Sequence, residues 1–220
     1  MRNYGYDTWY DYHELILGDR KKEKNFVKAI ELCNYFIIIY SKNLLNSPCA
    51  ITEESLIYTE AKKRNISIFP LLYNISFNEL PVEIQNRIEN LIYNEVTETT
   101  ECIASINQIV VKMLLDEMAY NELEVTPHIN FSMIECLSDN YLRAILTEYL
   151  NLAKDNFNAR ICILYCVYKY IKENMPLINI PEHYCRTIEY LSHYTKLNIA
   201  YNHKELIIAE LVIMNLLILL

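Results

Sequence analysis

Short runs of large apolar residues alternate with longer amphipathic stretches in the first half of the chain. Two of these runs, 35–41 (YFIIIYS) and 66–73 (ISIFPLLY), are rich in Ile, Phe and Tyr and do not alternate with polar residues. Such runs are typical of parallel strands that helices cover on both faces. The segment between them predicts a helix, with Ser47 or Thr52 as its N-cap and basic residues at 62–64 in its last turn.

An aromatic run upstream of these strands, DTWYDY at 7–12, predicts one more strand. Apolar spacing at 21–33 predicts a helix that joins this strand to the run at 35–41. The resulting order is strand, helix, strand, helix, strand, which favours an open doubly wound sheet. After the second buried run, the pattern predicts a short helix at 82–94 and an amphipathic helix at 101–118.

The pattern changes at about residue 119, where strand-like runs give way to helical periodicity. Prolines at 127, 176 and 181 separate the periodic segments, and the predicted helices are 138–154, 158–174, 182–198 and 203–220. We therefore predict two domains. Residues 1–118 form an α/β domain with a flavodoxin-like open parallel sheet, and residues 119–220 form an all-helical domain.

The last segment, 206–220, is almost wholly apolar and raises the question of a membrane span. It has 15 residues, includes Glu210 and Asn215, and is shorter than the roughly 20 residues that cross a bilayer. A charged residue near the middle of a membrane helix is costly. We therefore expect a buried core helix or an oligomer-interface helix, and keep membrane attachment as the less favoured alternative.

Composition excludes several classes of function. The formal net charge is −8, so the chain lacks the basic footprint of a nucleic-acid-binding protein. Only two glycines occur, Gly5 and Gly18, and neither of the common glycine-rich phosphate loops can be formed from them. Seven cysteines at irregular spacing, with no signal peptide before them, predict a reducing cytosol.

Two adjacent carboxylates, Glu53 and Glu54, occupy the start of the helix that follows the strand ending at Ser41. In open α/β sheets the ligand crevice lies outside the carboxyl edge of the strands, so these side chains are expected near a binding site. The alternative is structural, because acidic residues favour any helix N-terminus.

Several separated motifs together resemble a Toll/interleukin receptor (TIR) domain of the bacterial type, over about residues 4–118. The similarity runs from GYDTWYDYHELILGD through AIELCNYFIIIYSKNLLNSPCAITEES to ISIFPLLYNISFNELP. These stretches correspond to the family's second strand, its following loop and helix, the strand ending in Ser, the Ser-x-aromatic-x-x-x-Glu segment and a strand ending in Ile-x-Pro. Because the motifs fall at compatible distances, the resemblance is specific.

The resemblance implies an enzyme, since many members of that family cleave NAD between nicotinamide and ribose. Aligning Ser47 with the family's serine places Glu53 on the catalytic glutamate and Glu54 on the next position, usually Leu or Ile. We take Glu53 as the catalytic candidate and Glu54 as its reserve. Cys49 stands where the family has an aromatic residue, which is a departure from the motif. NAD is then the substrate, with no separate cofactor.

The family's loop after its second strand, here HELILGD at 13–19, lines the nucleotide site and makes contacts between domains. By the resemblance, five positions are expected to contribute to NAD binding: Trp9, Asp11, Leu17, Gly18 and Ser41. Trp9 and Leu17 are equally compatible with roles in the core or at an interface.

Complete members of the family begin with a strand and a helix that precede the segment corresponding to DTWYDY. This chain contains only MRNYGY before it, so the first strand is expected to be missing. Three explanations stay open. The true start can lie upstream, the strand can come from another chain, or the 7–12 strand can pair directly with 35–41.

A metal site is conceivable from the sequence, since Cys162 and Cys166 lie one helical turn apart, with His183 and Cys185 later in the sequence. Without a C-x-x-C pair, ordinary packing of small cysteines is the favoured interpretation, and no metal is expected.

The sequence therefore predicts a cytoplasmic TIR protein that hydrolyses or cyclises NAD in bacterial signalling or antiphage defence. Self-association through both the TIR and the helical regions is expected, with no nucleic-acid partner. The alternative is a non-catalytic TIR adaptor that acts through homotypic protein contacts.

Overall fold

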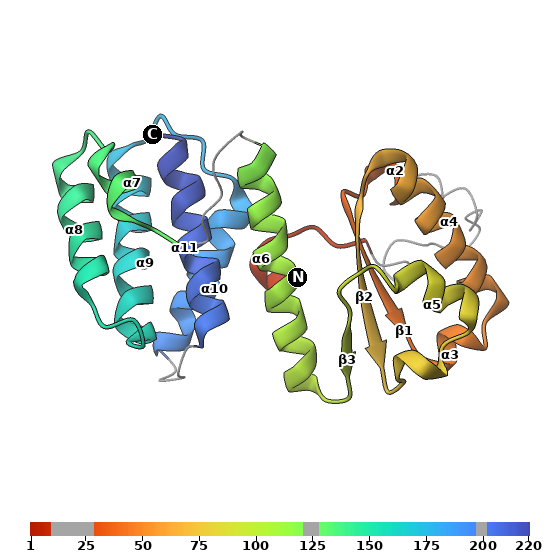
Figure 1. Ribbon diagram of the computed structural model, residues 1–220. Helices are drawn as coiled ribbons and strands as arrows, with labels where there is room; N and C mark the ends of the chain where they lie inside the picture. The colour runs from red at the N-terminus through yellow and green to blue at the C-terminus, as the bar shows by residue number, and fades with distance from the viewer. Residues whose placement is uncertain (10–28, 121–127, 197–201) are drawn as a thin grey trace. The chain divides into compact units, whose positions relative to one another are not determined.

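The computed structural model describes residues 1–9, 29–120, 128–196 and 202–220 (Figure 1). Their contacts group into two compact units, each with its own core. The α/β unit comprises Thr8–Ser105, and the helical unit comprises Met1–Asp7 together with Ile106–Leu220. The larger segment of the helical unit thus begins at Ile106, whereas the pattern of the sequence predicts a boundary between residues 118 and 119.

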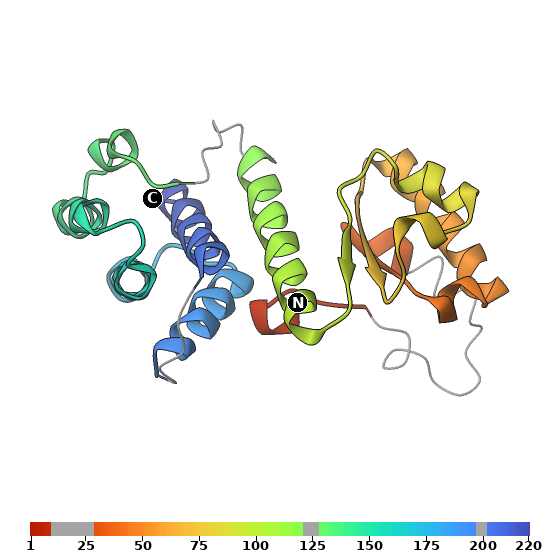
Figure 2. The same ribbon diagram turned by 60° about the horizontal axis from the view of Figure 1, so that its bottom comes forward.

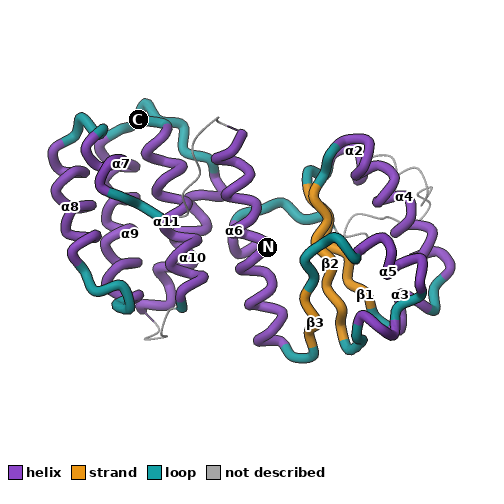
Figure 3. Tube along the Cα trace, in the orientation of Figure 1, coloured by secondary structure: helices purple, strands orange, loops and turns teal. Residues whose placement is uncertain are grey.

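The α/β unit is built on a parallel sheet whose strands are coloured orange in Figure 3. In the described part of the chain the strands are β1 (Tyr35–Tyr40), β2 (Ser67–Tyr73) and β3 (Asn94–Val96), in the order β1-β2-β3. β1 and β2 consist almost entirely of aromatic, β-branched and aliphatic residues, which favour extended backbone. Both long strands were predicted within one residue of their observed bounds.

Helices connect these parallel strands, as parallel pairing requires. Two helices, α3 (Lys42–Leu45) and α4 (Pro48–Arg64), lie between β1 and β2, and α5 (Val82–Ile88) lies between β2 and β3. α4 begins at Ser47, whose hydroxyl accepts a hydrogen bond from the Ala50 amide at 3.3 Å. Ser47 is therefore the N-cap, in preference to Thr52.

The core of the α/β unit lies between one face of the sheet and these helices, on the side where Figures 1 and 2 show them. Its fully or nearly fully buried members are Ile38, Tyr40, Leu72, Ile75, Leu80, Ile84 and Ile88. On the opposite face of β1, Ile37 is 37% exposed and Ile39 is 53% exposed. Among the residues that the structure describes, the helices of this core pack on the Ile38 and Tyr40 side of β1, so the expected burial on both faces is not observed for this strand.

Two expected elements can be compared with the structure only in part: the strand at 7–12 differs there, and the helix at 21–33 agrees. Asp7–Trp9 form no regular strand, so the predicted strand at 7–12 is not formed there, and its remaining residues lie outside the described ones. Of the predicted helix at 21–33, the structure describes α2 (Ala29–Leu32). β3 and α7 (Phe131–Glu135) were not predicted, because each is too short to leave a periodic pattern.

The helical unit contains the four long helices expected from the sequence. After α6 (Thr99–Tyr120), which begins in the α/β unit, these are α8 (Asn140–Asn151), α9 (Phe157–Asn174), α10 (Glu182–Lys196) and α11 (His203–Ile218). Side chains from 205 to 217 of α11 are all buried, and the helix packs against α9 and α10. The apolar segment at 206–220 is therefore mainly a core helix. Among the described helices, none combines the length and the hydropathy needed to cross a membrane.

The first seven residues are part of the helical unit. They contain the short 3-10 helix η1 (Arg2–Tyr4), and Tyr4 is buried. The Tyr4 hydroxyl donates to Asn107 Oδ1 at 2.6 Å, and its carbonyl accepts from the Thr187 hydroxyl at 2.8 Å. The MRNYGY segment, which the family resemblance relates to the α/β fold, thus packs against α10.

Candidate functional site

The carboxyl edge of the sheet is where a parallel α/β fold presents its loops and the first turns of the following helices. β1 leads into Ser41, the N-cap of α3, whose hydroxyl accepts a hydrogen bond from the Leu44 amide at 3.3 Å. β2 ends at Tyr73, which is 42% exposed. Ser41 thus has a defined local role in holding α3, and its side chain is partly accessible.

Glu53 lies in the second turn of α4 and is partly exposed. Its Oε1 accepts a hydrogen bond from the thiol of Cys49, one turn earlier, at 3.4 Å. Cys49 is itself exposed. A carboxylate in this position can be reached from solvent and holds one weak donor, so oxygen lone pairs stay available for other donors, such as ribose hydroxyls.

Glu54, the next residue, points into the core of the α/β unit. Its side chain is 1% exposed, and Oε1 accepts a hydrogen bond from the Tyr40 hydroxyl at 2.7 Å. Oε2 lies 2.9 Å from Nη2 of Arg87 in α5, although this contact lacks hydrogen-bond alignment. The three side chains therefore tie the first half of α4 to β1 and α5.

Burial raises the pKa of the Glu54 carboxyl, while the Tyr40 hydrogen bond and the Arg87 charge act in the opposite direction. Burial likewise raises the pKa of Tyr40, to which its contacts with Tyr58 and Glu54 add. A carboxyl group enclosed in this way cannot be approached by a dissolved substrate. Of the two glutamates, Glu53 is therefore the one with access to a ligand.

Sequence reasoning missed Tyr40 and Arg87 as partners of Glu54, and Tyr58 as the hydrogen-bond partner of Tyr40. The helical period carries a signal for part of this arrangement. Glu54, Tyr58 and Ala61 are spaced by four and three residues, which places them on one face of α4. Ala61 is buried in the structure. A prediction that the face with Ala61 packs on the sheet would therefore have placed Glu54 in the core. The identity of Arg87 as its ion partner has no such signal, since α5 is distant in sequence.

The other predicted binding residues are only partly described. Trp9 is partly buried and lies in a segment without regular structure. Asp11, Leu17 and Gly18 lie outside the described residues. Ser41 thus caps α3, and Glu53 lies in the second turn of the following helix α4. The contribution of the predicted loop at 13–19 stays an expectation.

A cavity of about 510 Å³ opens at the carboxyl edge of β2, lined by Tyr73, Cys102 and residues 97–100. Glu53 does not line it. The Glu101 carboxylate caps the start of α6 by accepting from the Thr97 amide at 2.6 Å and from the Glu98 amide at 3.1 Å. These hydrogen bonds lower the pKa of Glu101. The helix N-terminus beside this cavity therefore already has an anionic partner within the chain.

Within the described residues, no group of three or more His, Cys, Asp and Glu side chains is arranged to hold a metal ion. Of the residues considered from the sequence, His183 instead contacts Glu117, with its Nε2 3.1 Å from Oε2. Cys162, Cys166 and Cys185 form no disulfide.

Comparison with known proteins gives one result for this chain. The family model of the TIR domain matches residues 1–86, which include both glutamates, β1, β2 and most of α5. No curated protein and no solved structure matches the sequence.

Proposed function

We propose, from the premise that the N-terminal part of this chain is a TIR domain, that it cleaves NAD into nicotinamide and an ADP-ribose product. The single observation that carries the proposal is the position of Glu53. It is the accessible carboxylate in the second turn of α4, directly after the strand and loop that end in Ser41 and Ser47. In the family resemblance this is the position of the catalytic glutamate.

One carboxylate is sufficient for this chemistry. When the bond between nicotinamide and ribose breaks, its electron pair returns to the nicotinamide nitrogen, which is cationic beforehand and needs no proton. Positive charge develops on the ribose ring, and a nearby anion stabilises it. A water molecule or a second nucleophile of the substrate then attacks the ribose carbon, giving a linear or a cyclic product.

The buried Glu54 supports this assignment indirectly. Its contacts with Tyr40 and Arg87 hold α4 against the sheet, so the preceding residue is presented on a fixed turn. Pre-positioned charge is what electrostatic stabilisation of a transition state requires.

The assignment can be tested with purified full-length protein and NAD, by following nicotinamide release chromatographically. We expect Glu53→Gln to lower the turnover rate by at least about a hundredfold, because the variant retains the side-chain volume and loses the charge. Glu60→Gln is the matched control, since Glu60 lies on the same helix and pairs with Lys63 at the surface. Equal turnover by all three proteins would remove Glu53 from the mechanism.

A second candidate function is a non-catalytic adaptor, and one observation favours it. Cys49 occupies the position at which the family has an aromatic residue, and it donates its hydrogen bond to Glu53 itself. TIR domains commonly associate with one another, so an adaptor would act through such contacts. Absence of nicotinamide release from a protein that still self-associates would select this function.

A further inference from the structure

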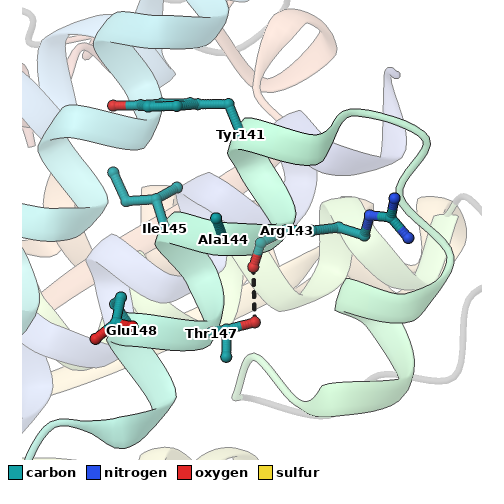
Figure 4. A pocket seen from close by; sticks show the side chains of 6 residues that line it. All are labelled: Tyr141, Arg143, Ala144, Ile145, Thr147 and Glu148. Atoms are coloured by element: carbon teal, nitrogen blue, oxygen red, sulfur yellow. Dashed lines mark hydrogen bonds between the residues drawn. The ribbon is translucent and has the colours of Figure 1, made fainter.

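The two faces of α8 in the helical unit differ in their burial. Its inner face carries Leu142, Leu146 and Tyr149, all fully buried. The opposite face bears an open groove of about 620 Å³, lined by Tyr141, Arg143, Ala144, Ile145, Thr147 and Glu148. Figure 4 shows Tyr141, Ile145 and Glu148 on one side of the helix, Arg143 on the other, and Ala144 between them.

Ala144 and Thr147 of this groove belong to a face of α8 that has the spacing of a helix-pairing seam. Along this face, Asn140, Ala144, Thr147 and Asn151 follow one another at intervals of four, three and four residues. This is the spacing of the a and d positions in a two-stranded coiled coil, so the four side chains share one face of α8. Asn140, Ala144 and Asn151 are exposed, and Thr147 is partly exposed. The seam therefore faces away from the core, and its small central residues allow another helix to approach closely.

Two opposite charges flank the seam at the positions where coiled coils place their salt bridges. Arg143 directly precedes Ala144, and Glu148 directly follows Thr147, so the two charges lie on opposite flanks and five residues apart. In a parallel pair of identical helices, a residue on one flank faces the residue five positions later on the other flank of the partner helix. Each Arg143 then faces the Glu148 of the second copy, giving two symmetry-related ion pairs. An antiparallel pair brings together like flanks and keeps the two charges apart.

We propose that α8 is a self-association surface, on which a second copy of this chain packs its own α8 in parallel, with the Arg143 and Glu148 side chains paired across a two-fold axis. The guanidinium of Arg143 donates to Asn140 Oδ1 within the chain, and its remaining donors are sufficient for the carboxylate of the second copy. Asn151 meets its own copy at the end of the seam, where an amide pair fixes the register and the parallel orientation.

The contact is a weak one. The seam is short and polar, and the net charge of −8 makes two copies repel each other. Such a surface adds to assembly when another part of the molecule has already raised the local concentration. Association through α8 does not require NAD cleavage, and it is measured separately from turnover.

Charge reversal in the full-length protein tests the pairing by sedimentation velocity over a range of concentrations. Arg143→Glu and Glu148→Arg each place like charges opposite each other, and we expect each to weaken dimerisation by at least about tenfold. The double variant restores opposite charges, and we expect it to dimerise like the wild type. Lys112→Glu, on exposed α6 surface of the same unit, makes the same change in net charge as Arg143→Glu and is expected to leave dimerisation unchanged.

A second measurement reports the position of the contact. Ala144→Cys is expected to give a reducible dimer under mild oxidation above the level of the wild type, because the parallel pair brings residue 144 next to its own copy. Lys112→Cys is the control and is expected to give none. A wild type that stays monomeric at its highest soluble concentration, single reversals that dimerise normally, or a double variant that is not restored would each overturn the proposal.

Discussion

At the scale of single residues, Glu53 and Glu54 show how adjacent identical side chains take different roles. Successive helical positions are separated by about 100°, so neighbouring residues cannot share one environment. Glu53 faces outward beside Cys49, and Glu54 is enclosed between Tyr40 and Arg87. The chemical type of both residues was evident from the sequence, but their orientation depended on which face of α4 met the sheet.

The buried carboxyl of Glu54 makes the stability of the α/β unit depend on pH. The pKa of Glu54 is raised in the folded protein. Between the unfolded and the folded pKa, the folded state therefore retains a proton that the unfolded chain has released, and the free energy of unfolding falls as pH rises. The contribution is fully present below the unfolded value of 4.5 and is lost as pH rises through the folded pKa. In the Glu54→Gln variant this side chain cannot ionise, so the variant lacks this pH-dependent contribution.

Urea unfolding of wild type and Glu54→Gln across this pH range checks the sign. We expect the free energy of unfolding of the wild type to decline relative to the variant as pH rises above 4.5. Curves that stay parallel, or that diverge in the other direction, would show that Arg87 compensates fully for burial.

At the scale of elements, the N-terminal segment illustrates a local conformation that serves a distant contact. Gly5 ends η1 with φ of 76°, a left-handed conformation that residues with a Cβ adopt at a cost. A Cβ built at this position would lie 2.6 Å from Cα of His183 in α10. Glycine is therefore needed here both for the turn and for the close approach of η1 to α10.

Gly5→Ala is accordingly expected to destabilise the helical unit by more than about 1 kcal/mol, the lower bound of the backbone cost alone. Asn65→Ala provides the comparison. Asn65 ends α4 with φ of 54° and is exposed, so its replacement carries the backbone cost without a steric clash. Thermal unfolding of both variants measures the difference, and equal losses would show that η1 moves away from α10 without penalty.

At the scale of the whole molecule, the buried clusters of the two units share no member among the described residues. Leu72 is fully buried in the cluster of the α/β unit, and Leu164 is fully buried in that of the helical unit. Chain connections join the units at residues 7–8 and 105–106. Separate cores favour separate unfolding transitions.

Leu72→Ala and Leu164→Ala are therefore expected to lower the stability of different transitions, each by about 2–5 kcal/mol. Hydrogen exchange during urea unfolding assigns each transition to its unit. If both substitutions instead shift one common transition by equal amounts, the two units unfold together in a single cooperative transition.

The sequence by itself determined the elements that local chemistry dictates. Apolar runs predicted β1 and β2, Ser47 was one of the two N-caps predicted for α4, and the apolar segment at 206–220 predicted a buried helix that includes Glu210. Only the tertiary structure decided that Glu54 faces Arg87, that Ile39 is exposed, and that Met1–Asp7 pack with the helical unit. Each of these outcomes depends on contacts with a segment that is distant in sequence. The local pattern of apolar and polar residues does not identify that segment.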